Sequence, residues 1–499
     1  MFALVRNSRR ILAILVVLAR HNLLNARLAR LADPAVRSQP AGRRLAGAFQ
    51  ALGPSFIKFG QALSTRPDLV GEAVAAELSE LQDRLPPFPA AQARQIIETE
   101  LGQPVETLYA SFAAEPVAAA SIAQVHLAIA ADGREVAVKI LRPGVEERFA
   151  DDVALFFWLA QLVSRLAPRL RRLRLSEAVK TFEETVAMEM DLRLEAAAAA
   201  EMAENFAGDD SVKIPGVDWQ RTARRVLTLE RVSGISVDEV EAIVAAGIDP
   251  EAVVKAAAAA YFNMVFRDGL FHADLHLGNL FVGPKGELIL VDFGITGRVD
   301  RQTRRYLGEM LLGFLSGNYR RVAEIHFEAG FVPPDKSIDA FTQACRSIAE
   351  PIMGRPLHEI SVARLLGQLF EITETFAMEA QPQLLLLQKS MLVVEGVGRR
   401  LAPRANMWEL ARPLIEGWMV AHLSPAAKMR DTVGTLAATL ESLPRLVAHA
   451  EKTVEALRHG GLKLHPDSLR SIGRKNGGWV PVWLPWVLVA ALTVLLLRR

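Results

Sequence analysis

The sequence has almost no cysteine, since Cys345 is the only one in 499 residues. One thiol forms neither an internal disulfide nor a cysteine-rich zinc site, so we expect a reducing compartment. A charge excess is also lacking, because 58 basic and 56 acidic residues leave a net charge of +2. This balance does not favour a nucleic-acid partner. Internal repeats are not evident, and 51% hydrophobic residues provide for a folded chain larger than one typical domain.

The clearest chemistry lies in FHADLHLGNLFVGPKGELILVDFG, residues 271–294. Its apolar run before Asp292 predicts a strand that ends at this acid, and Asp274 and Asn279 fall on the preceding loop. In phosphoryl transfer, a loop Asp orients the acceptor, while an Asn and a strand-end Asp hold magnesium against the phosphates. The sequence therefore predicts a catalytic Asp274 and a Mg²⁺ site formed by Asn279 and Asp292.

A site of this kind also needs an upstream strand lysine that contacts the nucleotide phosphates. In DGREVAVKILRPG, Asp132 and Gly133 predict a hairpin turn, and residues 135–141 predict a strand that carries Lys139. Taken alone, such a lysine is more simply a solvated edge charge. Because Lys139 precedes the two acidic motifs in the order that a kinase requires, we predict that it contacts nucleotide and takes part in catalysis.

Glycine is missing from PVAAASIAQVHLA, residues 116–128, where an ordinary protein kinase has its Gly-rich loop. Glycine permits positive φ and close approach of the backbone to phosphate, and alanine restricts both. A plain β-hairpin edge is the simpler interpretation, but the position one strand before Lys139 favours a nucleotide-covering loop. The expected nucleotide-binding residues are Ala118, Ala119, Ala120, Ser121, Ile122 and Ala123.

Residues 176–207 predict one continuous helix, because Ala, Glu, Met and Leu dominate and neither Gly nor Pro occurs. A kinase lysine needs a helical glutamate partner. Glu195 is the first candidate for this catalytic role and Glu189 the second, although a solvated helix face would explain any single acid. Asp191 and Glu195 would share a face at i,i+4.

Together with FIKFGQALSTRPDLV, residues 56–70, these motifs resemble the UbiB family of atypical, protein-kinase-like proteins associated with ubiquinone (coenzyme Q) biosynthesis. The family's Lys-x-Gly-Gln signature is matched by Lys58 and Gln61, and its Glu-x-Asp helix by Glu189 and Asp191. The Ala-rich loop and the His-Ala-Asp segment match as well, so the resemblance covers residues 56–294. The family usually reads His-Ala-Asp-Pro-His-Pro-Gly-Asn. Here leucines 275 and 277 replace both prolines, and no ligand is lost.

The resemblance implies an α+β, atypical protein-kinase-like bilobal fold with an N-terminal helical extension and a helical C-terminal extension. It also implies that Lys58 and Gln61 reach Glu189 and Asp191 across the site, in an insertion that occludes a protein substrate. The expected cofactors are ATP or ADP with Mg²⁺. The expected activity is that of an ATP-dependent kinase or ATPase that supports ubiquinone biosynthesis, with a phosphoryl acceptor that the sequence does not name.

Both ends of the chain predict membrane contact. Residues 479–497 contain no charge and are long enough to span a bilayer. Residues 1–48 hold nine arginines and one acid around an apolar core too short to span, which predicts a basic amphipathic helix on anionic lipid rather than a signal peptide. We therefore expect a protein of the cell inner membrane. Basic residues flank the span on both sides and do not orient it, but an ATP site would place the bulk of the chain in the cytoplasm. Expected partners are membrane lipid, ubiquinone precursors and other ubiquinone-biosynthesis proteins.

The expected domain order has six parts. They are the basic segment (1–48), a helical extension (49–112), a kinase-like N-lobe (113–235), a helical C-lobe (236–455), a linker (456–478) and a transmembrane helix (479–497). Residues 300–445 read as amphipathic helices without a motif that indicates chemistry.

Two other functions remain open at this stage. One is a small-molecule phosphotransferase, because HADLHLGN followed by VDFG also resembles aminoglycoside and choline kinases. The other is a nucleotide-binding pseudokinase that serves as a scaffold, whose core would carry the same residues. Lys58 and Gln61, the Ala-rich loop and the C-terminal span favour the membrane-anchored atypical kinase.

Overall fold

The computed structural model describes residues 2–23, 34–64, 70–79, 81, 85–166, 175–351, 372–373, 375–378, 382–403, 413–414 and 416–418. The chain divides into two compact units, Met1–Val420 and Ala421–Arg499. The expected linker and transmembrane helix, residues 456–497, lie outside the described residues. Among the helices that are described, none combines the length and the apolar character needed to cross a membrane.

The N-terminal sheet has five strands in the order β1-β3-β4-β6, with β2 paired to β3. All of these pairs are antiparallel. Strand β4 spans the seven residues that the sequence predicts. Because successive side chains point to opposite faces, its valines face the core and Lys139 emerges on the other side. The strands are β1 (Tyr109–Phe112), β2 (Ala118–Ala119), β3 (Ala123–Ala130), β4 (Glu135–Leu141) and β6 (Val226–Glu230).

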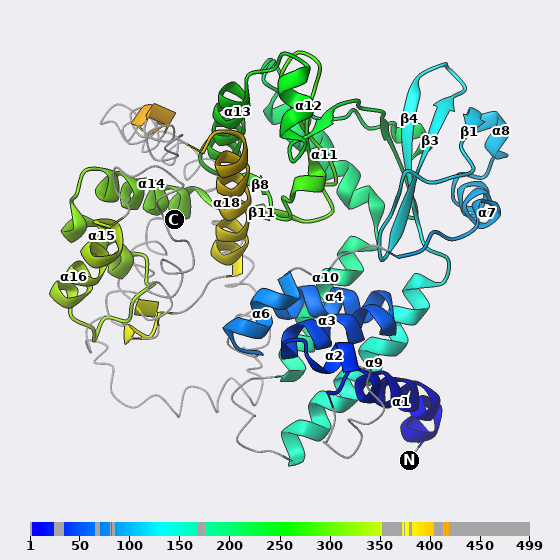
Figure 1. The fold of residues 1–499 in the computed structure, drawn as a ribbon, viewed down its shortest axis with the longest axis horizontal. Coiled ribbons are helices and arrows are strands. Elements are labelled where there is room, and N and C mark those ends of the chain that lie inside the picture. The colour runs from blue at the N-terminus through cyan, green and yellow to red at the C-terminus, as the bar shows by residue number, and fades with distance from the viewer. Residues whose placement is uncertain are drawn as a thin grey trace, which may run out of the picture. The chain divides into compact units, whose positions relative to one another are not determined.

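Two helices, α7 (Ala90–Leu101) and α8 (Val105–Leu108), cover one face of this sheet (Figure 1). Helix α7 buries Ala93, Ile96 and Ile97, a spacing that places them on one helical face against the valines of β4. Lys139 lies on the opposite face of the sheet. Since β1 pairs with β3, the sheet already begins ahead of residue 113, where the N-lobe was expected to start.

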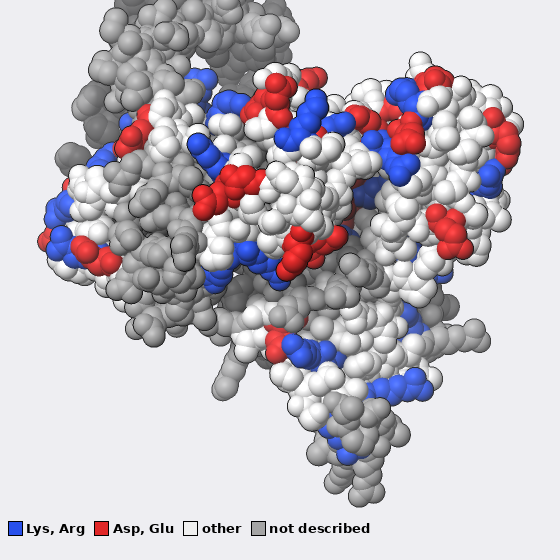
Figure 2. Space-filling model, turned by 45° about the horizontal axis from the view of Figure 1, so that its top comes forward, with Lys and Arg blue, Asp and Glu red and all other residues white. Residues whose placement is uncertain are grey.

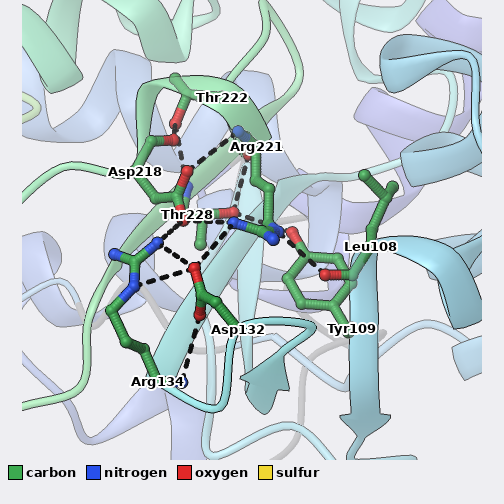
Figure 3. A network of polar contacts seen from close by, with 8 residues as sticks. All are labelled: Leu108, Tyr109, Asp132, Arg134, Asp218, Arg221, Thr222 and Thr228. Carbon is green, nitrogen blue, oxygen red and sulfur yellow. Dashed lines mark hydrogen bonds and ion pairs between the residues drawn. The ribbon is translucent and has the colours of Figure 1, made fainter.

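A polar network fixes the β3–β4 hairpin that leads to Lys139 (Figure 3). The turn has the predicted form, with Gly133 at φ 87°. Arg134 and Arg221 both donate to Asp218 Oδ2, at 2.8 and 2.7 Å, and Arg221 Nε donates to the Leu108 carbonyl at 2.8 Å. The hairpin, the end of α8 and the 3₁₀ turn η3 (Trp219–Arg221) before β6 are thereby held in one frame.

The N-terminal extension consists of helices that pack against the later helices α9 and α10 (Figure 1). Gly60 of the Lys-x-Gly-Gln motif has a packing role, because a Cβ there would lie 2.6 Å from Phe49 Cδ2. The core between these helices contains five phenylalanines, Phe49, Phe56, Phe59, Phe156 and Phe182, among aliphatic side chains. The helices are α1 (Phe2–Arg20), α2 (Pro34–Arg37), α3 (Ala41–Leu52), α4 (Pro54–Ser64), α6 (Glu72–Ser79), α9 (Val145–Leu166) and α10 (Leu175–Glu189).

The prediction of one continuous helix over residues 176–207 is wrong. Helix α10 ends at Glu189, and α11 (Leu192–Asn205) begins after a break at Asp191. The Asp191 side chain accepts a hydrogen bond from the Arg193 backbone N–H at 3.2 Å and so caps α11. A short acidic side chain that bonds its own backbone in this way competes with helix continuation. Favourable helix propensities on both sides did not reveal the break.

The C-lobe combines small sheets with helices. Gly269, at φ 72°, ends the helical run that precedes residues 272–279, which we call the acidic loop. A Cβ at Gly269 would lie 2.6 Å from the Val299 carbonyl oxygen. Strands β5 (Val212–Lys213), β10 (Leu288–Leu290), β9 (Leu280–Val282) and β7 (Ile235–Ser236) form one sheet in that order, and β8 (Leu270–His272) pairs with β11 (Thr296–Arg298). The helical elements are α12 (Val240–Ala245), α13 (Pro250–Phe262), the π-helical turn η4 (Asn263–Asp268), the 3₁₀ turn η5 (Leu277–Asn279), α14 (Arg301–Leu315), α15 (Tyr319–Glu328), α16 (Ile338–Ala349) and α18 (Pro382–Leu401).

Charges of both signs are mixed on one face of the molecule. Lys and Arg lie interspersed with Asp and Glu on the face shown in Figure 2. This distribution agrees with the net charge of +2.

Candidate active site

Lys139 of β4 lies at the centre of a cluster of ion pairs. Its Nζ atom is 2.8 and 2.9 Å from the two carboxylate oxygens of Glu195 on α11, and 2.7 Å from Asp292 Oδ1. Of the two acids considered as its helical partner, the structure therefore pairs Glu195 with Lys139. Glu195 is buried, whereas the Asp292 side chain is 46% exposed. Asp292 can accept a further ligand from solvent.

Burial and the neighbouring charges together set the pKa values of the three side chains in this cluster. Burial by itself would lower the pKa of Lys139, but the carboxylates of Asp292 and Glu195 outweigh it and raise this pKa far above its usual value. Burial raises the pKa of Glu195 to about 7, with Lys139 opposing the shift. Burial also disfavours ionised Asp292, yet Lys139 holds the pKa of that carboxyl well below its usual range. Near neutral pH, Lys139 is thus a cation and Asp292 an anion.

The backbone at Asp292 has an unusual conformation. Its φ of 63° lies in the left-handed region, which Asp tolerates better than most residues. Asp292 follows the predicted strand, although β10 ends at Leu290 rather than at Asp292 itself. A Cβ on Gly294 would lie 3.4 Å from Asp292 Oδ1 and 3.7 Å from Glu195 Oε2, so the glycine leaves space beside the two carboxylates. Strain of this kind is concentrated at functional sites.

His272 orders the loop that carries Asp274. Its ring is fully buried, with Nε2 3.1 Å from the Val291 carbonyl oxygen and Nδ1 accepting the Asp274 backbone N–H at 3.3 Å. Burial lowers the pKa of His272, so the ring is neutral and carries its proton on Nε2. Asn279 Nδ2 donates to the Asp274 carbonyl at 3.2 Å, and the Val291 N–H donates to the Asn279 carbonyl at 3.1 Å. These bonds hold the loop against Val291, which lies between the end of β10 and Asp292.

The two leucines that replace prolines in this loop anchor it by packing. Leu275 is buried in the core of the C-lobe, and Leu277 packs against the same core. Ser236 of β7 also donates to the Leu277 carbonyl at 3.4 Å. The loop is therefore held by apolar burial where the family pattern has proline rings.

Asn279 and Asp292 suit a hard divalent cation. The Asn279 amide nitrogen is bonded to Asp274, which leaves the amide oxygen as the ligand atom. Mg²⁺ is usually bound by one or two carboxylates together with waters and substrate phosphates. Among the described residues, no group of three or more His, Cys, Asp or Glu side chains lies close enough to hold a metal ion. The donor set fits Mg²⁺ bound jointly with nucleotide phosphates.

The Ala-rich stretch is a short hairpin. Ala118 and Ala119 pair with β3, and the Ala120 N–H donates to the Ala123 carbonyl at 2.8 Å. None of its residues from 118 to 123 has positive φ, so alanine is not strained here. Ser121, Ile122 and Ala123 are buried. Of the six residues of this loop that were expected to bind nucleotide, only the three leading alanines are at least partly exposed to solvent.

Arg142, which sequence patterns did not single out, fastens this hairpin to the extension. Its Nε donates to the Ala120 carbonyl and its Nη1 to the Pro86 carbonyl, both at 2.9 Å. Gln124 of β3 bonds both backbone groups of Phe88, at 3.0 and 3.2 Å. The partners of Arg142 are main-chain carbonyls distant in sequence, and no residue pattern marks such contacts.

Lys58 reaches across to Glu189, as the resemblance implied. The Lys58 Nζ–Glu189 Oε2 distance is 2.7 Å, and the two side chains are only 10% and 8% exposed. Asp191 does not share this contact, because it caps α11 and pairs with Arg193 at 2.6 Å. Gln61 is half-buried about one turn beyond Lys58 on α4.

Lys389 is a second site residue that sequence analysis missed. Its Nζ lies 2.6 Å from Asp274 Oδ1. Burial would raise the pKa of Asp274, but the charge and hydrogen bond of Lys389 lower it. Lys389 belongs to α18, within the residues where the sequence indicated no chemistry. A lone lysine in an amphipathic helix gives no signal of this contact.

Comparisons with known proteins identify two matching domains and many relatives. Residues 80–326 match the ABC1 atypical kinase-like domain, and residues 345–406, which include Lys389, match the UbiB helical domain. A Marinobacter nauticus protein named probable protein kinase UbiB is 41% identical over 424 residues, covering 84% of this chain and 78% of that protein. An Aeromonas hydrophila protein of the same name is 43% identical over 423 residues, with the same two coverages.

A solved structure shows the same fold. The Mycobacterium tuberculosis protein Rv3197, determined in complex with erythromycin, is 27% identical and superposes with a TM-score of 0.53. The match covers 71% of this chain and 90% of that protein. A mixed helix and sheet fold of the kinase type is thereby confirmed. On its motifs, its two matched domains and its relatives, this chain belongs to the UbiB family of atypical kinase-like proteins.

Proposed function

We propose that this protein binds Mg-nucleotide at the Lys139 cluster and acts as an ATP-dependent kinase or ATPase that supports ubiquinone biosynthesis. The observation that carries the proposal is the contact of Lys139 with both Glu195 and Asp292. A buried glutamate that orients a strand lysine beside a strand-end aspartate is the arrangement that kinases use to hold nucleotide phosphates.

Each residue then has a defined task. Lys139 contacts the nucleotide phosphates, and Glu195 fixes its direction. Asn279 and Asp292 would hold Mg²⁺, which neutralises phosphate charge when it is bound. Asp274, kept ionised beside Lys389, orients the acceptor hydroxyl or water and receives its proton.

Calorimetric titration of the full chain in detergent with ADP and ATP, with and without Mg²⁺, tests the proposal. We expect Mg²⁺-dependent binding that falls at least about tenfold in Lys139→Met, since a charged contact contributes about 1.5–3 kcal/mol. Lys180→Met is the matched control, because Lys180 forms an exposed pair with Glu184 on α10. Failure of the wild type to bind nucleotide would contradict the proposal.

Complementation of a deletion strain by a variant that lacks the proposed catalytic acid distinguishes an enzyme from a scaffold. We expect a strain that lacks the protein to lose ubiquinone, and Asp274→Asn not to restore it, because the acceptor would no longer be oriented. Ubiquinone is measured in lipid extracts, with protein levels checked in the same cells. Full restoration by Asp274→Asn would instead support the scaffold function.

We also propose contact with the inner membrane through α1. Leu12, Leu15 and Val16 are exposed and follow the i, i+3, i+4 spacing of one helical face. Arg10, in contrast, pairs with Asp152 at 2.8 Å and donates to the Leu52 carbonyl at 3.1 Å. The exposed apolar side of α1 therefore supports an interfacial contact, and Arg10 holds the helix to the extension.

Deleting residues 476–499 should end stable membrane integration, because the proposed span would be lost. The truncated protein should still bind anionic vesicles at low salt and leave them at high salt, since surface attraction is screened. Vesicle co-sedimentation across a salt series measures this. Retention after a carbonate wash would show deeper insertion of the N-terminus, and no binding at low salt would exclude α1 as a contact.

Ala119→Gly should change the relative affinity for ADP and ATP. Glycine weakens an extended segment by about 0.5–1 kcal/mol and widens its backbone freedom. The hairpin that we expect to cover the phosphates would therefore loosen at β2. Titration with each Mg-nucleotide measures the ratio, with Ala197→Gly outside the loop as a control. If both affinities stay within about twofold, roughly 0.4 kcal/mol, the loop has no such role.

A further inference from the structure

The acidic loop has an acid for the acceptor but no lysine or arginine of its own. Residues 272–279 read HADLHLGN. Lys389 of α18 supplies a basic side chain beside this loop, with its Nζ 2.6 Å from Asp274 Oδ1. Both side chains remain open to solvent, at 44% exposure for Lys389 and 35% for Asp274. A ligand that arrives at Asp274 therefore meets the lysine as well.

The position of Lys389 is fixed by hydrogen bonds on either side of it. Ser390, whose side chain is fully buried, donates to the His272 carbonyl at 2.8 Å. Tyr261 of α13 donates its hydroxyl to the Leu387 carbonyl at 2.8 Å. Helix α18 is thus bonded to the strand that leads directly into the acidic loop. Such support from neighbouring bonds is what a preorganised charge requires.

The other lysines near the site are already engaged. Lys139 is held by Glu195 and Asp292, and Lys58 forms a buried pair with Glu189. In phosphoryl transfer, charge spreads over the oxygens of the terminal phosphate, and preorganised cations near these oxygens stabilise the transition state. An accessible lysine next to the acceptor-orienting acid is suited to this role.

We propose that Lys389 is a further catalytic residue, which contacts the terminal phosphate of bound ATP while it keeps Asp274 in place. The inference rests on the proposed nucleotide function. It assigns the helical domain a direct part in the chemistry and makes a specific prediction. Loss of the Lys389 charge should affect ATP, which has a γ-phosphate, far more than ADP, which lacks one.

The test compares Lys389→Met and Lys389→Arg with the wild-type full chain in detergent. Methionine keeps most of the unbranched stem and removes the charge, whereas arginine keeps the charge. Arg399→Met is the matched control, because Arg399 lies on the same helix and pairs with Glu395 at 3.0 Å. The readouts are the Kd for Mg-ATP, the Kd for Mg-ADP, ATP turnover and the thermal unfolding midpoint.

We expect Lys389→Met to weaken Mg-ATP binding at least about tenfold and Mg-ADP binding by less than about twofold. Turnover should fall by about 100-fold, the loss typical when one transition-state contact is removed. Lys389→Arg should recover part of both, and Arg399→Met should behave as wild type. A low thermal unfolding midpoint would show that Lys389→Met does not fold. In that case, recovery of Mg-ATP binding and turnover in Lys389→Arg would decide whether the charge at position 389 matters.

Two results would overturn the inference while leaving the nucleotide site intact. One is an unchanged ratio of ATP to ADP affinity in a folded Lys389→Met. The other is a rise in turnover, which would make the Lys389–Asp274 pair an inhibitory contact. If the wild type binds neither nucleotide, the proposed function fails first and the inference fails with it.

Discussion

Asp292→Asn should abolish most Mg²⁺-dependent nucleotide binding. The substitution keeps the shape of the side chain and removes a full charge from the site, where a bound cation is the largest local charge. Loss of even an outer-shell partner lowers metal affinity by about 10- to 100-fold, so a direct ligand should matter at least as much. Thermal shift and titration with Mg-ADP, compared with the same measurements in EDTA, give the effect.

The fold should survive this change. Lys139 keeps two contacts with Glu195 after the Asp292 charge is lost. The left-handed backbone at position 292 also suits Asn as well as Asp. Asp335→Asn, at an exposed position, is the matched control. If Mg-nucleotide stabilises Asp292→Asn as strongly as the wild type, Asp292 is not a metal ligand.

Sequence reasoning succeeded where a contact is local or follows a fixed order of motifs. The β4 strand, the turn at Gly133 and the place of Asp292 after β10 all depend on short patterns, and each was predicted. The contact between Lys58 and Glu189 was predicted from the family resemblance, because the family's motifs imply which residues meet in the folded protein. Spacing alone gave no reason for these two residues to meet.

The failures have two physical causes. Asp191 starts a new helix because its side chain accepts the backbone N–H of Arg193, an outcome that average propensities do not resolve. That break separates Glu189, which meets Lys58, from Glu195, which meets Lys139. Lys389 and Arg142 were missed because tertiary packing brings them to partners far along the chain. The site therefore depends on the extension and on α18 as much as on the kinase motifs.

Lys58→Ala should destabilise the protein by about 3–5 kcal/mol, because it leaves the carboxylate of Glu189 buried without this partner. At 10% and 8% exposure, neither side chain of the pair is screened by much water. The shift in the unfolding midpoint measures the loss. Lys180→Ala is the control, since it breaks an exposed pair on α10 and should change stability by no more than about 0.5 kcal/mol. A change of that small size in Lys58→Ala would show that the pair is effectively solvated.

The double variant Lys58→Met, Glu189→Gln separates stability from occlusion. Replacing both partners removes the unpaired charge, so much of the stability should return. If the pair closes the acceptor site, the double variant should be folded and open, with more nucleotide turnover and adventitious autophosphorylation than the wild type. Both are measured with labelled ATP after the unfolding midpoint has been checked. A fall in both activities with folding intact would instead make Lys58 an ordinary catalytic contributor, because its charge also helps to keep Asp274 and Asp292 ionised.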